Sequence, residues 1–145
     1  MPDSSIVGRT IPRERVVAAV ARDGEREFVG RCVRLLGGDI DAALVEVVGG
    51  ESAPYVLEGH EGGPDGYWPR AWALRALLYA WDPIAEPAVL AACSDEHWRV
   101  REMAAKVIAA RMTTSVDAPH TVEQLAKDDN ARVRAAAERA RGTLG

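Results

Sequence analysis

Apolar residues recur at helical spacing along most of the chain, and strand-like alternation is nearly absent. The clearest stripe contains Val100, Ala104 and Val107, with Met103 and Ile108 on the same side of a helix. The chain is therefore predicted to be all-α. The helices are expected over residues 11–21, 25–36, 39–48, 68–81, 84–93, 97–111, 121–127 and 131–141, with a short one near 53–58.

Short polar or glycine-containing breaks group these helices into hairpins, with a first (A) and a second (B) helix in each. The predicted pairs are 11–21 with 25–36, 39–48 with 68–81, 84–93 with 97–111, and 121–127 with 131–141. Residues 49–66 are predicted to be an insertion in the second pair, and residues 1–9 a flexible N-terminus. We expect one domain over residues 1–145.

A signature recurs in the B helices: an aspartate, then an arginine about six positions on, then an alanine three after that. The copies are Asp95, Arg101, Ala104; Asp128, Arg134, Ala137; and, more loosely, Asp65, Arg70, Ala73. Recurrence of one signature at a near-constant interval along the chain is typical of stacked-repeat proteins, because a single hairpin cannot bury its own apolar stripe. We expect the Asp and Arg of successive units to bond across the seam between repeats.

This pattern resembles HEAT repeats, especially the short bacterial type also found in phycobilisome-lyase-related proteins. The matching residues are Asp95, Val100, Arg101, Ala104, Val107 and Ile108, then Asp128, Val133, Arg134 and Ala137. The resemblance is strong over roughly 65–145 and weaker over 10–60. It implies a right-handed α-α superhelix, a solenoid of about four helix pairs with B helices on the concave side. It also implies a binding surface rather than catalysis.

The repeat register aligns one basic residue in each B helix, on the side away from the predicted core. The row consists of Arg34, Arg75, Lys106 and Arg139. Stacked helices would space these charges regularly, which suits an acidic segment of a partner protein. The alternative is a solvated ridge in which Glu102 neutralises Lys106 at i, i+4.

A second aligned row carries the aromatic residues Tyr67 and Trp98, with Arg26 and Ala131 in the other units. Leu74 and Leu78 are expected to point outward beside it, forming an apolar patch of the kind that often marks a binding site. Alternatively, Tyr67 and Trp98 fold over the seam between repeats. Trp72 and Trp81 are predicted to be core residues.

Composition narrows the classes of partner and location. The 145 residues carry a net charge of −4, and seven acids but no Lys or Arg lie between Leu35 and Pro69. This acidity disfavours nucleic acid as a partner. No apolar run is long enough to cross a membrane and no signal peptide is evident, so a cytoplasmic location is expected. Cys32 and Cys93 are expected to be buried free thiols.

Catalytic and metal motifs are weak. His60, His97 and His120 lack metal-ligand spacing, the glycine-rich GHEGGPDG lacks the Lys-Ser/Thr of a phosphate loop, and no nucleophile motif is present. The alternative is a nucleic-acid binder or a relative of the HEAT-like alkylpurine DNA glycosylases, in which Trp98, Arg101 and Asp95 would lie on the concave face. The favoured hypothesis is a non-catalytic scaffold without cofactor or metal, binding a protein partner through the two aligned rows. Oligomeric state and partner identity are left open.

Overall fold

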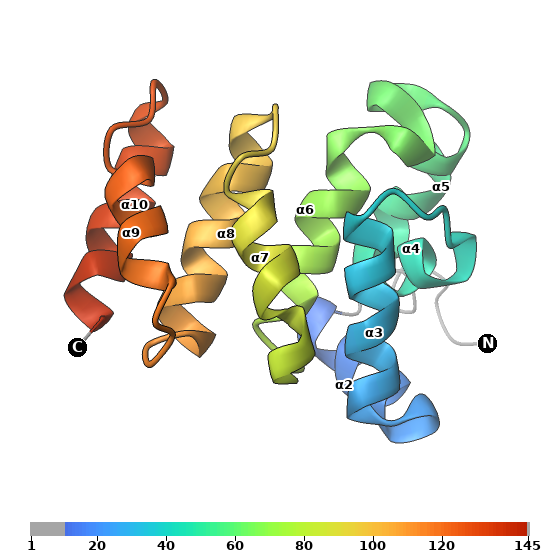
Figure 1. Ribbon diagram of the computed structural model, residues 1–145. Helices are drawn as coiled ribbons and strands as arrows, with labels where there is room; N and C mark the ends of the chain where they lie inside the picture. Colours follow the sequence, from blue (N-terminus) through green and yellow to red (C-terminus); the bar gives the residue numbers. More distant parts are fainter. Residues whose placement is uncertain (1–10, 145) are drawn as a thin grey trace. The chain divides into compact units, whose positions relative to one another are not determined.

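The computed structural model describes residues 11–144, and every regular element within them is a helix (Figure 1). The all-α prediction is therefore confirmed, while the handedness of the superhelix stays a prediction. Contacts group the chain into two compact units, Met1–Asp82 (unit 1) and Pro83–Gly145 (unit 2). The predicted flexible segment 1–9 lies outside the described residues, and the prediction of one domain stays a prediction.

Unit 1 is built around α6, which packs against both α3 and α4, while α2 packs against the same two helices. Its elements are α2 (Pro12–Asp23), α3 (Glu25–Leu36), α4 (Ala42–Gly49), η1 (Gly50–Ser52), α5 (Ala53–Leu57), η2 (His60–Asp65) and α6 (Tyr67–Ala76). The short elements η1, α5 and η2 lie in the segment 49–66 that was predicted to be an insertion, and its status as an insertion stays a prediction. They lie between α4 and α6 in the chain and contact both helices (Figure 1).

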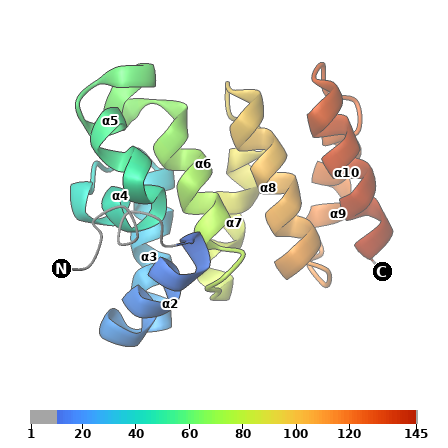
Figure 2. The same cartoon turned by 180° about the vertical axis from the view of Figure 1, so that it is seen from behind.

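Unit 2 consists of two consecutive helix hairpins. Its elements are η3 (Pro83–Ala85), α7 (Glu86–Ala92), α8 (Trp98–Arg111), α9 (Ala118–Leu125) and α10 (Ala131–Thr143). Helices α7 and α8 pair, α9 and α10 pair, and α8 lies beside α10 (Figure 2). The two predicted C-terminal hairpins are confirmed, with their second helices in contact as stacked repeats require.

Three helix boundaries differ from the predictions by three residues or more. Helix α4 begins at Ala42 because Asp41 caps it, accepting a hydrogen bond from Leu44 N at 3.0 Å. Ile40 therefore lies outside the helix and is 59% exposed, not in the core. Helix α9 begins at Ala118, three residues before the predicted start, with a proline in its first turn. Helix α6 ends at Ala76 and continues as single turns to Ala80.

The buried faces confirm most of the predicted core positions. Ala104, Val107 and Ile108 are fully buried on α8, and Trp72 is also in the core. Trp81, predicted to be a core residue as well, is only half-buried, because it follows the last turn after α6.

Glu102, expected on a solvated ridge, and Leu74, expected to point outward, are both buried. Glu102 and Ala105 are buried because α10 packs across that side of α8. Leu74 is fully buried because α6 is covered by two helices. These corrections remove Leu74 from the proposed apolar patch.

The two cysteines match the prediction of buried free thiols. Cys32 lies on α3 and Cys93 follows α7, and both are buried without a disulfide. Burial raises the pKa of each thiol to about 12, because the thiolate would lose its hydration. Neither thiol is therefore reactive in this environment.

Candidate functional site

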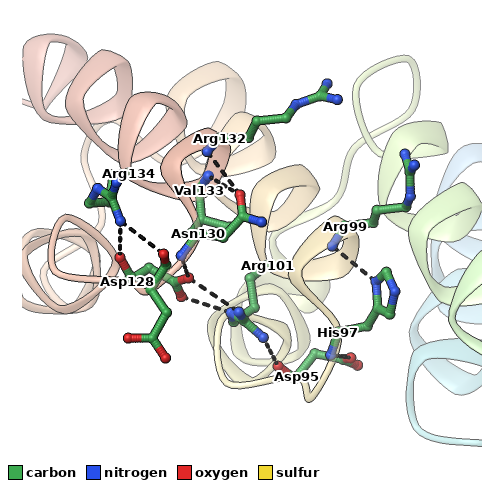
Figure 3. A network of polar contacts seen from close by, with 10 residues as sticks. Asp95, His97, Arg99, Arg101, Asp128, Asn130, Arg132, Val133 and Arg134 are labelled. Atoms are coloured by element: carbon green, nitrogen blue, oxygen red, sulfur yellow. Dashed lines mark hydrogen bonds and ion pairs between the residues drawn. The ribbon is translucent and has the colours of Figure 1, made fainter.

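The signature arginines close the turns that precede their own helices. Arg101 Nη1 donates to the carbonyl of Asp95 at 2.8 Å, and Arg134 Nη1 donates to the carbonyl of Asp128 at 2.8 Å (Figure 3). In unit 1, Arg70 Nη1 makes the same bond to the carbonyl of Asp65 at 3.1 Å. The repeated spacing thus has a local structural purpose in all three copies, since it satisfies a turn carbonyl.

Arg101 also bridges the two hairpins of unit 2. Its Nε lies 2.7 Å from Asp128 Oδ2 and its Nη2 lies 3.2 Å from Oδ1. The predicted Asp–Arg bond across the seam is confirmed here. Burial alone would raise the pKa of Asp128, but hydrogen bonds from Arg101 and from Asn130 N outweigh it and hold the pKa below its ordinary value.

The helix starts of α8 and α10 are fixed by capping side chains in equivalent positions. His97 Nδ1 accepts a hydrogen bond from Arg99 N at 3.1 Å, and Asn130 Oδ1 accepts one from Arg132 N at 2.8 Å (Figure 3). The backbone N–H of each cap donates to the preceding aspartate, Asp95 or Asp128, at 2.9 Å. His97 is therefore part of the helix start, which accounts for its place in the sequence.

The outer sides of α8 and α10 carry four basic residues, which we call the basic face. They are Arg99, Lys106, Arg132 and Arg139. Within each helix the two residues are seven apart, so they lie on one side, two turns from each other. Trp98 lies beside the two arginines of this face. The guanidinium of Arg99 is 4.6 Å and that of Arg132 is 5.3 Å from its ring centroid. Two of the predicted row residues and one predicted aromatic residue thus belong to this face.

One buried carboxylate orders the centre of the basic face. Glu102 is the one charged side chain that is buried among the described residues, with 7% of its surface exposed. Its Oε2 lies 3.1 Å from Arg132 Nε and 4.0 Å from Lys106 Nζ. The expected contact between Glu102 and Lys106 is present, but the shorter bond joins Glu102 to the neighbouring helix. A charge so well enclosed needs these partners.

The row residues of unit 1 have different surroundings. Arg34 is exposed on α3 and pairs with Glu27 of the same helix at 3.6 Å. Arg75 is half-buried, and its Nη2 donates to the carbonyl of Val48 at 2.6 Å. Tyr67 donates its hydroxyl proton to Glu61 Oε2 at 3.1 Å. The pKa of Arg75 is lowered by burial and by the nearby charge of Arg15.

Two residues of the basic face, Arg99 and Arg132, were not among the predicted site residues. The repeat register contained the signal, because they are 33 positions apart like Arg101 and Arg134. Unit 1 carries Trp68 at the corresponding place, which hides the basic pattern from a comparison across all units. Arg15 had no such signal, since it lies on α2, outside the B-helix register.

Membrane-spanning helices and metal clusters are both absent from the described residues. No helix among them is long and apolar enough to cross a membrane. No cluster of three or more His, Cys, Asp or Glu side chains among residues 11–144 is arranged to hold a metal ion.

Comparison with known families supports the repeat architecture. The family model for HEAT repeats matches residues 63–141, which is more than half of the chain and includes all three copies of the Asp–Arg–Ala signature. Comparisons with curated proteins and with solved structures gave no significant match. The chain belongs to the HEAT-repeat family.

Proposed function

We propose that this chain is a non-catalytic protein-interaction scaffold whose basic face on α8 and α10 receives an acidic segment of a partner protein. HEAT repeats commonly serve as protein-interaction scaffolds and are typically non-enzymatic. Stacked helices offer a regular, extended surface on which side chains of successive repeats lie side by side. Membership of the family therefore supports the class of function, and the side chains of unit 2 indicate which kind of partner would bind.

The observation that carries the proposal is the charge of the basic face. Four cations lie on two adjacent helices, and the buried carboxylate of Glu102 pairs with two of them, Arg132 and Lys106. The Arg101–Asp128 bond joins the two hairpins of unit 2, whereas Arg139 is exposed on α10. The remaining positive charge faces solvent and favours approach of an acidic segment.

The aromatic residue Trp98 gives the basic face an apolar element. Its ring lies beside the guanidinium groups of Arg99 and Arg132 and is half-buried. An acidic segment that also carries an apolar side chain would match both elements, because aromatic and arginine residues are enriched in binding hot spots. Arg101 and Asp95, by contrast, bond to each other and to Asp128 or His97, which supports a structural role for both rather than contact with DNA bases.

The test uses a fluorescently labelled peptide of alternating Glu and Leu, with a DNA duplex of similar charge as the second probe. We expect the parent chain to bind the peptide. The double variant Lys106→Gln/Arg139→Gln should weaken binding about three- to tenfold, since each exposed charge contact contributes roughly 0.2–1 kcal/mol. The control is Lys127→Glu, which changes the net charge by the same amount in the turn before α10.

Fluorescence anisotropy at several salt concentrations separates the outcomes. Weaker peptide binding by the double variant, with the control unchanged, supports the proposal. Tighter binding of DNA than of peptide, with a steep fall in affinity as salt rises, would favour the nucleic-acid alternative. Equal peptide binding by parent and double variant would identify the basic face as a solvated ridge.

A further inference from the structure

The insertion in unit 1 creates two adjoining hollows, which we call the insertion cleft. The aromatic pocket, of about 240 Å³, is lined by Ser52, Tyr55, Val56, Glu61, Trp68 and Trp72. The arginine pocket, of about 270 Å³, has Arg15, Gly49, Glu51 and Arg75 in its lining. The two hollows share Ser52 and Trp72, so they are neighbouring parts of one cleft. Both hollows are lined in part by residues of the segment between α4 and α6.

The carboxylate of Glu61 is held firmly at the aromatic pocket. Its Oε2 accepts hydrogen bonds from Tyr67 Oη and Trp68 Nε1, both at 3.1 Å. Its backbone has φ 55°, and among the described residues it is the one non-glycine with positive φ. Gly66 closes the same turn so tightly that an added Cβ would lie 2.8 Å from the carbonyl oxygen of Glu61. Such a strained, well-determined residue in a pocket is a feature of functional sites.

Three of the other residues that line this pocket are aromatic, beside Ser52 and Val56. Trp68 and Trp72 stack with ring centroids 5.9 Å apart, and Tyr55 stacks on His60 at 4.2 Å. A cation beside these rings gains from their quadrupoles and from the fixed carboxylate. A primary ammonium has three N–H donors, and in this lining the side-chain oxygens of Glu61 and Ser52 would have to accept all of them, because the rings and Val56 offer no acceptor. A quaternary ammonium has no N–H to satisfy, and its methyl groups suit the apolar walls.

The arginine pocket offers the opposite charge. Arg15 Nε donates to the carbonyl of Val47 at 2.7 Å, and Arg75 Nη2 donates to the carbonyl of Val48 at 2.6 Å. These bonds anchor both guanidinium groups at the end of α4, close enough for the charge of Arg15 to lower the pKa of Arg75. Burial lowers the pKa of the Arg15 guanidinium, and the attraction of Glu51, which also lines this pocket, raises it by less.

A bound anion would relieve the repulsion between the two guanidinium groups. Arg75 is half-buried, and its buried Nε has no hydrogen-bond partner in the structure. Guanidinium groups bind phosphate with several parallel hydrogen bonds, which makes phosphate a better match than a smaller anion. The two pockets thus favour opposite charges on one ligand.

We propose that the insertion cleft binds a choline phosphate group, with the quaternary ammonium in the aromatic pocket and the phosphate against Arg15 and Arg75. This site lies in unit 1 and is independent of the acidic partner proposed for unit 2. The group occurs both as a soluble ester and as the head group of phosphatidylcholine, and both sources present the same two charges. Trp72, which lines both pockets, would lie beside the link between them.

Isothermal titration with the full chain compares choline phosphate, choline and inorganic phosphate at equal ionic strength. We expect choline phosphate to bind at least about tenfold more tightly than either half, because the second contact becomes intramolecular. Glu61→Gln should weaken choline phosphate and choline about five- to tenfold and leave phosphate unchanged. Arg75→Gln should do the reverse, weakening choline phosphate and phosphate but not choline.

Controls separate binding from folding. Glu58→Gln and Arg13→Gln change exposed charges beside the insertion and on α2, outside the residues that line the cleft, and both should bind like the parent. The amide introduced by Glu61→Gln retains an oxygen that accepts the bonds from Tyr67 and Trp68, so that variant should melt with the parent. If Arg75→Gln melts early, Arg15→Gln provides the second test of the phosphate end.

Sedimentation with phosphatidylcholine vesicles identifies the source of the group. Vesicle binding that Glu61→Gln weakens supports recognition of the lipid head group, and binding of the soluble ester alone supports a soluble ligand. The proposal fails if neither form binds. It also fails if choline phosphate binds no better than its halves, or if the two variants lose the same ligands.

Discussion

Unit 2 and unit 1 both contain a bidentate Asp–Arg pair that joins neighbouring parts of the fold. The paired residues occupy different positions of the repeat in the two units. In unit 2 the signature arginine Arg101 bonds to Asp128. In unit 1 the signature position of α3 is Val29, which is fully buried, and Arg31 bonds instead to Asp41 through two contacts of 3.0 Å. An Asp–Arg contact thus occurs in both units, and more than one position in the repeat can supply it.

The two pairs differ in how well they are enclosed. The side chain of Asp128 is 11% exposed, whereas that of Asp41 is 32% exposed, and their arginines are equally enclosed. Arg31 also lies 3.5 Å from Asp23, so its charge is shared between two carboxylates. The Arg101–Asp128 pair in unit 2 should therefore contribute more to stability than the Arg31–Asp41 pair in unit 1.

The connections between helices show the same contrast. Unit 2 joins its helices by short turns, and its outer surface is a regular face of repeated side chains. Unit 1 places η1, α5 and η2 between α4 and α6, and these elements create the two hollows of the insertion cleft. Unit 2 also has a hollow, of about 320 Å³ between α9 and the end of α10, but the two hollows of unit 1 are lined in part by elements that the regular hairpins lack.

The largest effect that would test the regular packing of unit 2 is expected from Ala104→Arg. Ala104 is fully buried on α8, where a long charged side chain would overfill the interface and lose its hydration. We expect the free energy of unfolding to fall by more than about 3 kcal/mol. Ala110→Arg, at an exposed site of the same helix, should change it by less than about 0.5 kcal/mol. Urea denaturation compares the two, and similar midpoints would contradict the assigned buried face.

The helices and the seam of unit 2 could be predicted because they follow from period and spacing. Val100, Ala104 and Val107 repeat at helical intervals, and Asp128 and Arg101 occupy repeat positions that require a partner. The burial of Glu102 could not be predicted, because it depends on Arg132 of another helix reaching across. The same holds for Arg15 and Arg75, which come together only through the packing of α2 and α6 near the end of α4.

An intermediate effect, specific to the interrupted unit, is expected from Gly49→Ala. A Cβ on Gly49 would lie 2.5 Å from the ring of Trp72, so the ring or the end of α4 must move. We expect a loss of about 1–3 kcal/mol in the free energy of unfolding, together with a shift of tryptophan fluorescence. Gly142→Ala, where an added Cβ meets nothing within 4 Å, is the matched control. Unchanged stability and fluorescence in Gly49→Ala would show that the close approach to Trp72 is not needed.

The smallest expected effect is the difference between the two Asp–Arg pairs, measured with Arg101→Met and Arg31→Met. Each variant leaves a partly buried carboxylate without its arginine, and we expect losses of about 1–2 kcal/mol for Arg101→Met and about half as much for Arg31→Met. Arg13→Met, an exposed residue of α2, is the control and should unfold like the parent. Equal losses in the two seam variants would contradict the ranking by enclosure.

The dependence on pH sharpens this measurement. The arginine hydrogen bonds help to hold the pKa of Asp41 and that of Asp128 below their ordinary values. A carboxylate whose pKa is lowered by folding stabilises the protein above its unfolded pKa of about 3.9, and this contribution disappears as the pH falls through the lower folded value. The parent should therefore lose stability on acidification from neutral pH, and Arg101→Met should lose less than the parent does. If both chains lose the same free energy of unfolding on acidification, the Arg101–Asp128 bond is not the source of the acid sensitivity. Other carboxylates would then have to account for it.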